Sequence, residues 1–446
     1  MKRRTQFVAG FVLLLAAAHA VAQNRFILHP APNVSAGTVA GRHGLTVLGP
    51  LDDQNRGLYV VTAPAALPVA QVMKDVSSDS AVLSFEQDLR LAVAESSAAL
   101  NQSTAAILDS LPAPSAVSYY GSPVLGAYLS QPAVGLIRLG DTQTTFGATG
   151  AGIVAIIDTG VDPNHVALKN SLVPGYDFVN NAAGMASEMT DVSPSTASVL
   201  NQSTASILDK TQVAVVNQST AAILDPYTVS ALSMAQLPPA FGHGTMVAGI
   251  VHLTAPTAKI MPLKAFRGDG SATLSDILRA IYYAADHGAN VINMSFSLLT
   301  PSVELANAIN YAEHKNITCV ASTGNLGLAF VTHPAALQKV IAVASTSNQD
   351  TRSSFSSYGG TTWVGAPGEG VITTYPGNNY AAAWGTSFSA PFVSGTSALV
   401  FQVRGRSDYS ETSNAVSKAL KLTPDLGRGR LDVYQAISQE VSPSGP

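Results

Sequence analysis

The sequence contains one cysteine, Cys319, among 446 residues, so no disulfide can form within the chain. Cys319 stands in an apolar stretch, which predicts a small buried core residue. Charged residues make up only 12% of the chain and leave a formal net charge of −4, which argues against a nucleic-acid partner. After residue 22 no run of about 18 uncharged apolar residues occurs, so no membrane-spanning helix is predicted there.

Residues 1–22 have the pattern of a secretory signal. Basic residues at positions 2–4 precede an apolar run over 7–18, and residues 20–22 match a small-x-small cleavage site. The apolar run is too short to span a bilayer comfortably. We therefore expect an exported protein, secreted or periplasmic, with no membrane contact once the signal is removed.

Residues 23–92 are predicted to form a small α+β domain with the order β-α-β-β-α-β. The expected strands are 25–28, 45–48, 57–62 and 81–85, and the expected helices are 36–44 and 64–75. A domain of this size is marginal for independent stability, so we expect it to fold against another part of the chain. Residues 93–130, rich in Ala, Ser and Pro, are predicted to be a linker.

A nine-residue repeat occurs in two distant parts of the chain. The segment NQSTAAILD at 101–109 recurs unchanged at 217–225 and as NQSTASILD at 201–209. The later copies belong to an array of octads over 193–224, inside an insert at about 183–240. A two-residue turn followed by a strand fits the eight-residue period, and so does a short helix capped by Asn or Asp. The sequence leaves both conformations open.

From residue 149 onward, long apolar runs alternate with helical patterns. The expected strands are 152–157, 258–266, 290–294, 317–322 and 340–344, and the expected helices are 275–287 and 302–314. The strands lack polar alternation, as expected when both faces of a parallel sheet are buried. The pattern predicts a doubly wound α/β domain over 131–446, with a mostly parallel sheet and active groups at the carboxyl ends of its strands.

Three polar residues at element boundaries are candidates for chemistry. Ser387 begins a helix rich in small residues, where backbone N–H groups can face a developing oxyanion. Pro391 is expected in the first turn of that helix, where its missing N–H breaks no bond. His243 lies between two glycines at the start of an apolar helix, and Asp158 ends an apolar strand.

Each of these residues also has an ordinary structural explanation, such as an N-cap serine or a strand-ending turn. An aspartic-protease site would need a second Asp-Thr/Ser-Gly beside Asp158-Thr-Gly, and the sequence has none. Taken together, Asp158, His243 and Ser387 follow one of the known sequence orders of a Ser-His-Asp triad.

The segments around these residues resemble the three signature segments of subtilisin-like serine proteases: AIIDTGVD at 155–162, GHGTMVAG at 242–249 and GTSFSAP at 385–391. The resemblance extends from about residue 135 to 437, interrupted by the octad insert. It implies a serine endopeptidase that acts on proteins or peptides, with Ser387 as nucleophile, His243 as base and Asp158 orienting the histidine. It also implies that the Asn325 amide and the Ser387 N–H stabilise the oxyanion.

The same resemblance implies where a substrate binds, namely as an added strand between two segments of the enzyme. The implied substrate-binding residues are Ser295, Phe296, Ser297, Gly268, Gly270, Leu274, Ser322 and Gly324. The family usually has glycine where Ser297 stands, so the mouth of the first pocket is expected to differ. Its floor near Thr332 carries no charge, which favours apolar or small side chains. No cofactor or catalytic metal is expected; no calcium is expected after Val251, and other calcium sites stay open.

Residues 23–92 resemble the inhibitory, folding-assisting propeptide of such proteases, with 85–91 as the tail that runs toward the active site. The chain is therefore expected to be a zymogen that cleaves itself between about 91 and 130. One hypothesis is that the linker and insert copies of the repeat pack together and hold the propeptide. The alternative is repeat expansion in a tolerant surface loop. The rival function is an exported, non-catalytic binding protein that uses the octads as its contact surface on a protease scaffold.

Overall fold

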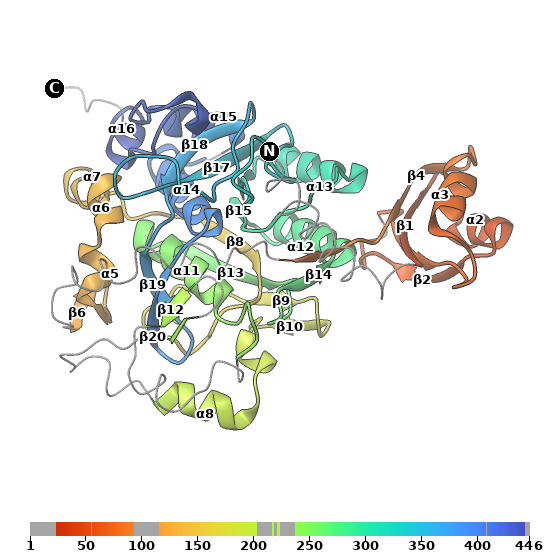
Figure 1. The fold of residues 1–446 in the computed structure, drawn as a ribbon, viewed down its shortest axis with the longest axis horizontal. Coiled ribbons are helices and arrows are strands. Elements are labelled where there is room, and N and C mark those ends of the chain that lie inside the picture. Colours follow the sequence, from red (N-terminus) through yellow and green to blue (C-terminus); the bar gives the residue numbers. More distant parts are fainter. Residues whose placement is uncertain are drawn as a thin grey trace, which may run out of the picture. The chain divides into compact units, whose positions relative to one another are not determined.

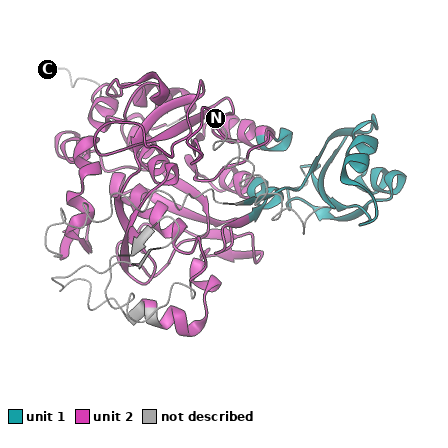
Figure 2. Cartoon of the chain, viewed as in Figure 1, with its two compact units in different colours: residues 1–91, 272–279, 302–305 teal, residues 92–271, 280–301, 306–446 magenta. Residues whose placement is uncertain are grey.

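The computed structural model describes residues 24–54, 56–92, 116–202, 216–217, 221–223, 237–406 and 408–441. The expected signal, the linker copy of the repeat and most of the copy at 201–209 lie outside the described residues. The chain divides into two compact units, coloured teal and magenta in Figure 2. Unit 1 contains the described residues up to 91 together with 272–279 and 302–305, and unit 2 contains the rest.

Unit 1 is built around a four-stranded antiparallel sheet in the order β2-β3-β1-β4. Its elements are β1 (Arg25–Pro30), α2 (Ala36–His43), β2 (Thr46–Pro50), β3 (Tyr59–Thr62), α3 (Val69–Ser77) and β4 (Val82–Gln87). This is the predicted β-α-β-β-α-β order. Phe26 and Phe85 stack in its core with ring centroids 4.8 Å apart, and Val39 and Val72 bury the two helices against them.

Helix α3 begins at Val69, whereas the periodicity predicted a start at 64. Pro68 is its N-cap and has an extended backbone, with φ −63° and ψ 131°. A residue that precedes a proline is also driven out of the helical region, so Leu67 cannot begin the helix. The proline therefore determines where α3 starts, although the apolar spacing continues through it.

Two carboxylates of unit 1 cap helices whose first turns belong to the same unit. Asp88 accepts hydrogen bonds from the N–H and the hydroxyl of Ser275, in the first turn of α12 (Leu274–Asp286), both at 2.8 Å. Glu86 accepts them from the first two N–H groups of α13 (Val303–His314), both at 3.2 Å. Negative charge is favourable at a helix N-terminus, where backbone N–H groups lack helical partners.

After β4 the chain forms one more short strand. This strand, β5 (Arg90–Ala92), pairs with β14 (Ser271–Thr273) in a two-stranded sheet. The N–H of Leu274 also donates to the carbonyl of Leu89 at 2.9 Å. The segment predicted to be the propeptide tail is thus bonded as an added strand.

An eight-stranded sheet organises unit 2, in the order β10-β9-β13-β8-β15-β16-β17-β18 (Figure 1). Its strands are β8 (Ile153–Asp158), β9 (Gly175–Asp177), β10 (Ala182–Gly184), β13 (Lys259–Lys264), β15 (Val291–Met294), β16 (Thr318–Ser322), β17 (Val340–Thr346) and β18 (Thr362–Pro367). All neighbours are parallel except β10, which is antiparallel to β9 at one edge. The predicted mostly parallel α/β sheet is confirmed. Cys319 is buried in β16, as predicted.

Strand β8 lies where the strand order changes direction. The chain passes from β8 to β13 on one side and later to β15 on the other. In open α/β sheets, binding sites form at the carboxyl ends of strands beside such a point. Asp158 is the last residue of β8 and so stands at this end.

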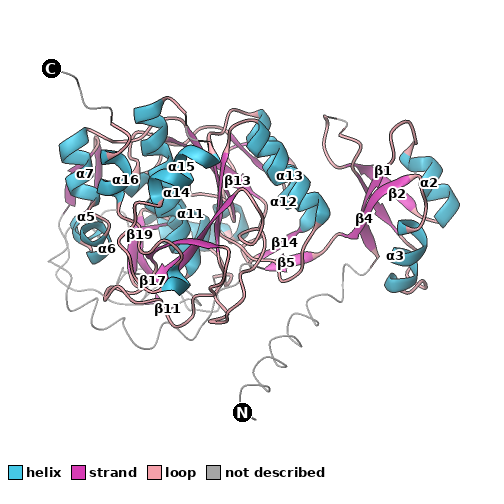
Figure 3. Cartoon of the chain, turned by 90° about the horizontal axis from the view of Figure 1, so that it is seen from above, coloured by secondary structure: helices cyan, strands magenta, loops and turns pink. Residues whose placement is uncertain are grey.

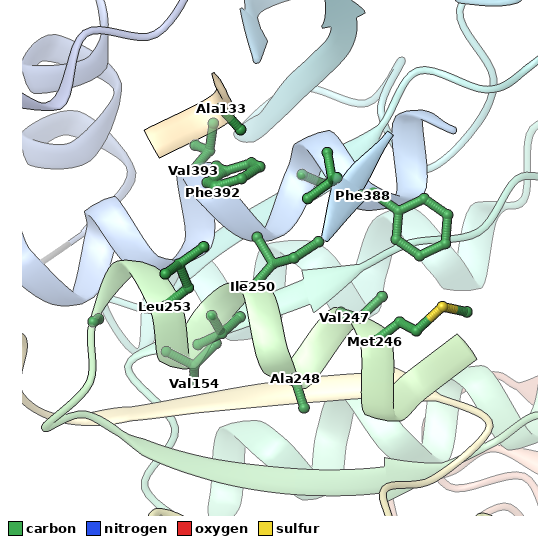
Figure 4. Packing of buried hydrophobic residues seen from close by; sticks show 14 of the residues in the cluster. Ala133, Val154, Met246, Val247, Ala248, Ile250, Leu253, Phe388, Phe392 and Val393 are labelled. Atoms are coloured by element: carbon green, nitrogen blue, oxygen red, sulfur yellow. The ribbon is translucent and has the colours of Figure 1, made fainter. Parts of the chain in front are cut away.

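Helices cover both faces of this sheet. Figure 3 shows α11 (His243–Thr254) and α14 (Thr386–Arg404) on one side of it, and α12 and α13, beyond their first turns, on the other. All of α11 and the first fifteen residues of α14 are buried. Both helices consist mainly of apolar and small residues, which fit into a closely packed interior. The two helices approach closely at Gly395, where an added Cβ would lie 2.5 Å from Cβ of Thr254. Figure 4 shows side chains of the core to which both helices contribute, among them Val247, Ile250, Phe388 and Phe392.

Residues 116–130, predicted to belong to the linker, instead pack into the core of unit 2. They form the hairpin of β6 (Ala116–Tyr119) and β7 (Ser122–Leu125), followed by α5 (Gly126–Ser130). The Tyr119 hydroxyl donates to the carbonyl of Leu253 at 2.7 Å, and the Tyr128 hydroxyl donates to that of Gly249 at 2.6 Å. These two buried tyrosines hold residues 116–130 against α11. The small and polar residues that surround them in the sequence do not indicate this packing.

Four further helices of unit 2 lie before and after this core in the sequence: α6 (Pro132–Leu136), α7 (Leu139–Phe146), α15 (Tyr409–Val416) and α16 (Val433–Ser438). In the part of the chain that the structure describes, no helix combines the length and apolar character needed to cross a membrane.

Within the described residues, the first octad is helical and the last contributes to strands. The first octad lies in α8 (Pro194–Gln202), where the Ser193 hydroxyl accepts from the N–H of Thr196 at 3.2 Å. The last octad enters a hairpin of β11 (Val216–Asn217) and β12 (Ala221–Ile223). Strand β12 pairs antiparallel with β20 (Asn379–Ala383), which pairs with β19 (Val371–Tyr375).

Candidate active site

A carboxylate and an imidazole are paired at the carboxyl end of β8. Nδ1 of His243 donates to Oδ1 of Asp158 at 2.7 Å, and the N–H of Thr159 donates to the same oxygen at 2.7 Å. Asp158 is 2% exposed and His243 is 1% exposed. Because the hydrogen bond to Asp158 keeps the proton on Nδ1, Nε2 is the basic nitrogen of the ring.

The start of α11 holds His243 close to β8. Its N-cap, Gly242, has φ +90°, a left-handed conformation that favours glycine. A Cβ on Gly244 would lie 2.0 Å from the carbonyl oxygen of Gly160. The two glycines that flank His243 in the sequence are thus required by the turn and by the close approach of two backbones.

Ser387 is the second residue of α14, directly before a residue that contacts the imidazole. The ring of Phe388, the next residue, lies against that of His243, with centroids 5.3 Å apart. The Ser387 hydroxyl donates to the carbonyl of Ser295 at 3.2 Å. The structure therefore brings Asp158, His243 and Ser387 to one place, from β8, α11 and α14.

Pro391 lies inside α14 and not in its first turn, because the helix already begins at Thr386. Its missing N–H removes the helical donor to the carbonyl of Ser387. The hydroxyl of Ser295 donates to that carbonyl at 2.9 Å instead. Pro391, which the pattern placed in the first turn, therefore leaves the Ser387 carbonyl free to accept a hydrogen bond from Ser295, the residue that follows β15 (Val291–Met294).

Asn325 is oriented by the residue that precedes Ser387. Its Oδ1 accepts hydrogen bonds from the N–H of Thr386 at 2.9 Å and from the Thr386 hydroxyl at 2.8 Å. The oxygen end of the amide is thereby fixed toward Thr386, and the NH₂ end points away from it. That arrangement makes Asn325 a hydrogen-bond donor beside the start of α14.

The predicted residues of the first pocket lie together. The Thr332 hydroxyl donates to that of Ser297 at 2.8 Å, and a Cβ on Gly324 would lie 2.9–3.3 Å from these two side chains. Ser322 is buried at the end of β16, two residues before Gly324, and Phe296 packs on Phe266 with centroids 5.3 Å apart.

The other predicted contacts lie elsewhere in the chain. Gly268 and Gly270 are in the loop after β13, where the carbonyl of Gly268 already accepts from the N–H of Ala240 at 2.8 Å. Leu274 belongs to unit 1 and is fully buried.

Sequence reasoning missed several polar groups beside Asp158 and His243. The most buried are Glu188, in the 3₁₀ turn η2 (Glu188–Asp191), and Lys264, at the end of β13. The Lys264 ammonium donates to the Thr159 carbonyl at 2.7 Å and pairs with Asp191. No local pattern marks Glu188, because its partners are 29 to 57 residues away in the sequence.

Residues 150–434 match the family model of the subtilases. The chain belongs to the subtilase family. This agrees with the resemblance carried by the three signature segments, and with the eight-stranded, mostly parallel sheet on which Asp158, His243 and Ser387 are placed.

Curated subtilases are similar over most of the domain. A thermophilic serine proteinase from Bacillus sp. (strain AK1) is 35% identical over 302 residues, which cover 66% of this chain and 64% of that protein. Thermitase from Thermoactinomyces vulgaris is 32% identical over 304 residues, 65% of this chain and 90% of thermitase. Subtilisin Savinase from Lederbergia lenta is 36% identical over 170 residues, 36% of this chain and 63% of that protein. The chain thus spans less than two thirds of the first of these relatives.

A solved structure supports the fold. The crystal structure of a lanthipeptide protease superposes with a TM-score of 0.53 and 22% sequence identity, covering 74% of this chain and 99% of that one. At this identity the likeness concerns the fold alone.

Proposed function

We propose that this subtilase is a secreted serine endopeptidase that hydrolyses peptide bonds through an acyl-enzyme. The observation that carries the proposal is the 2.7 Å hydrogen bond from His243 to Asp158 beside Ser387, at the carboxyl end of the central sheet. A nucleophile, a base and a group that orients the base are the three parts that such chemistry needs.

The proposed reaction uses Ser387 as the nucleophile. Its Oγ attacks the scissile carbonyl carbon while Nε2 of His243 takes the hydroxyl proton, which in the resting enzyme is donated to Ser295. Asp158 holds Nδ1–H and stabilises the imidazolium that forms. The imidazolium then gives its proton to the leaving amine, and water, activated by the same histidine, hydrolyses the acyl-enzyme. Every proton and charge is assigned to a protein group, so we propose that no cofactor takes part.

The oxyanion of the tetrahedral intermediate is proposed to accept from two donors, the N–H of Ser387 and the NH₂ of Asn325. The first lies at the positive end of α14. The second is fixed in direction by the two bonds from Thr386 to Oδ1. Donors held in place before the reaction stabilise the developing charge without reorganisation.

The substrate chain is proposed to add as a strand beside residues 295–297, with its side chain entering the pocket near Ser297, Gly324 and Thr332. These residues are uncharged, and the Ser297–Thr332 hydrogen bond narrows the space above Gly324. We therefore propose a preference for small or apolar side chains over Lys, Arg, Asp and Glu. Peptides that differ only at this position test it: the kcat/KM for Ala or Leu should exceed that for Lys.

We further propose that residues 23–92 are an inhibitory propeptide, and that 1–22 are a secretory signal. The support comes from unit 1, where the Glu86 and Asp88 carboxylates cap α13 and α12 and the tail strand β5 pairs with β14. A tail bonded as a strand resembles the way a substrate would bind. Because residues 116–130 are packed into unit 2, we place the autocleavage between 92 and 115.

The experiment is the mass of the secreted protein, wild type beside Ser387→Ala, after incubation at neutral pH. Ser389→Ala is a matched control, since Ser389 is buried in the same helix and its hydroxyl has no hydrogen-bond partner among the described residues. Wild type and Ser389→Ala should lose residues up to a site between 92 and 115, and Ser387→Ala should keep them. If all three keep the N-terminal region and none hydrolyses casein, the proposal is wrong.

A further inference from the structure

A fully buried carboxylate, Glu188, lies between the segments that carry Asp158 and His243, and the mechanism above gives it no part. Its Oε2 accepts hydrogen bonds from the Thr159 hydroxyl and from the N–H of Gly242, both at 2.9 Å. Its Oε1 accepts from the N–H of Thr245 at 3.2 Å and from the Thr245 hydroxyl. Four donors thus converge on the two oxygens of one side chain.

The donors come from the residues next to the proposed catalytic pair. Thr159 follows Asp158, while Gly242 and Thr245 stand on either side of His243. The carboxylate therefore connects the end of β8 with the first turn of α11 on both sides of the histidine. If the carboxylate were removed, the buried N–H groups of Gly242 and Thr245 would lose this acceptor, at a considerable desolvation cost.

We propose that Glu188 is a positioning residue: it fixes His243 relative to Asp158, and its negative charge keeps that pair in its catalytically competent hydrogen-bond pattern. The inference rests on the proposed peptidase function.

The Thr159 hydroxyl is the link between the two carboxylates. Its oxygen lies 2.9 Å from Oε2 of Glu188 and 3.3 Å from Oδ1 of Asp158, and it accepts from the N–H of Gly244 at 2.9 Å. The single hydroxyl proton goes to Glu188 when Glu188 is ionised. When Glu188 carries a proton, the hydroxyl is free to donate to Asp158 instead. Asp158 then has a further donor and is a weaker acceptor for Nδ1–H of His243.

Glu188 changes its charge in the range where the enzyme is proposed to work. Burial raises the pKa of Glu188 to about 7, against the opposing effects of the hydrogen bonds from Thr245 and Thr159 and of the Lys264 charge. The charged or titratable groups around it are Asp158 on β8, His243 on α11, Lys264 on β13 and Asp191 on its own turn. Of these, the Asp158 charge contributes to the raised pKa of Glu188. On this account protonation of Glu188, as well as of the histidine, lowers the rate below neutral pH.

Glutamine cannot replace Glu188 in this setting. Each carboxylate oxygen faces one backbone N–H, that of Gly242 or that of Thr245. Whichever way a glutamine amide is turned, its NH₂ group meets one of these N–H groups, and neither can accept a hydrogen bond. A protonated glutamate avoids this conflict, because its O–H oxygen still has a lone pair for the backbone donor.

The test compares kcat, KM and the pH dependence of kcat/KM for the processed wild type, Glu188→Gln and Glu188→Asp. In Glu188→Gln, kcat should fall about 10- to 100-fold, because a small displacement of a catalytic group costs this much. KM should change less than about threefold, since no substrate contact is lost. The fall of kcat/KM at acid pH, the acid limb, should reflect the protonation of two groups in wild type, Glu188 and His243, and of one group in Glu188→Gln. Glu188→Asp keeps the charge and is expected between the two in kcat, with the two-proton limb retained.

Ser187→Ala is the matched control, because the Ser187 hydroxyl caps the same 3₁₀ turn through the N–H of Met189 at 3.2 Å but contacts none of the four donors. It should lower the urea midpoint and leave the acid limb unchanged. If Glu188→Gln does not fold, two other results would show a purely structural role for Glu188. One is an acid limb in wild type that follows a single protonation. The other is a Glu188→Asp variant with a reduced urea midpoint but wild-type kcat and an unchanged acid limb. Wild-type kcat and limb in Glu188→Gln would overturn the inference, whereas an inactive wild type would instead overturn the proposed function.

Discussion

Helix α11 carries a buried histidine at each end, and their surroundings differ. His243, at the first position, donates from Nδ1 to the Asp158 carboxylate at 2.7 Å. His252, in the last turn, lies 3.2 Å from the Ser171 hydroxyl and has the Tyr119 ring edge-on, with centroids 5.8 Å apart. Nε2 of His252 has no hydrogen-bond partner among the residues that the structure describes.

The difference shows that burial alone does not make a base. Burial, together with a smaller effect of the nearby His165, lowers the pKa of His252 to about 4, so His252 is neutral at ordinary pH. At the other end of the helix a proton taken up by His243 would lie beside Asp158, with Glu188 nearby. A carboxylate partner, rather than a position in an apolar helix, is what separates a candidate catalytic histidine from a core one.

The largest loss of kcat is expected when the His243 end of α11 loses its carboxylate partner and so resembles the His252 end. Asp158→Asn removes the carboxylate charge from His243 and favours the wrong tautomer, so kcat should fall by about 10⁴-fold. Ser171→Ala, which removes the hydroxyl beside His252, should leave kcat within about twofold. Steady-state kinetics on one peptide substrate compares the two. Equal effects of the two substitutions would remove the distinction between the histidines.

A second substitution tests whether the His243 end also holds the oxyanion donor. Asn325→Leu keeps the approximate size of the side chain and removes its NH₂ group, so kcat should fall by about 10²–10³-fold, the range known for such donors in this family. KM should stay nearly constant, because the donor acts on charge that develops only in the transition state. A loss confined to KM would place Asn325 in ground-state binding instead.

The His252 end should control acid stability. Its pKa is lower in the folded protein, about 4, than the unfolded value near 6.5, so between these values the unfolded chain binds more protons. Stability is then full above pH 6.5 and falls as the pH drops toward 4, by on the order of 3 kcal/mol. His252→Leu should remove much of this loss.

Urea unfolding at pH 7 and pH 4.5 measures it, with Ser387→Ala as the common background to prevent autolysis. An identical acid-induced loss with and without His252 would assign the effect to other groups, such as the buried His165.

The smallest effect on catalysis is expected from the octads. Deleting 193–225 removes α8, β11 and β12 but keeps Glu188, so kcat/KM of the processed enzyme should change less than about threefold. The melting temperature should fall by a few degrees, because Leu200 is buried and β12 pairs with β20. Under the hypothesis that like repeats pack together, processing should also slow. Processing at the wild-type rate would favour the alternative of repeat expansion in a tolerant loop.

Much of the fold was predictable because burial leaves a periodic pattern. Burial of each position leaves its own mark on the sequence, as apolar runs in β8, β13, β15, β16 and β17 and as apolar stripes in α12 and α13. The prolines were harder, because Pro68 and Pro391 act through single backbone bonds that periodicity does not detect. The extent of the linker was missed because Tyr119 and Tyr128 are anchored by hydrogen bonds to a helix far along the chain.

The candidate site divides in the same way. Asp158, His243 and Ser387 stand in short motifs whose glycines are required by local geometry, as at Gly244. Glu188 stands in no motif, since its four donors meet only after the chain has folded.

The most direct measurement is the reaction of the processed enzyme with a serine-directed sulfonyl fluoride, followed by peptide mass analysis. The account predicts one adduct, on the peptide that contains Ser387, with matching loss of peptidase activity, and no adduct in His243→Ala. Modification of another serine with the same loss of activity, or full activity after Ser387 is modified, would contradict it.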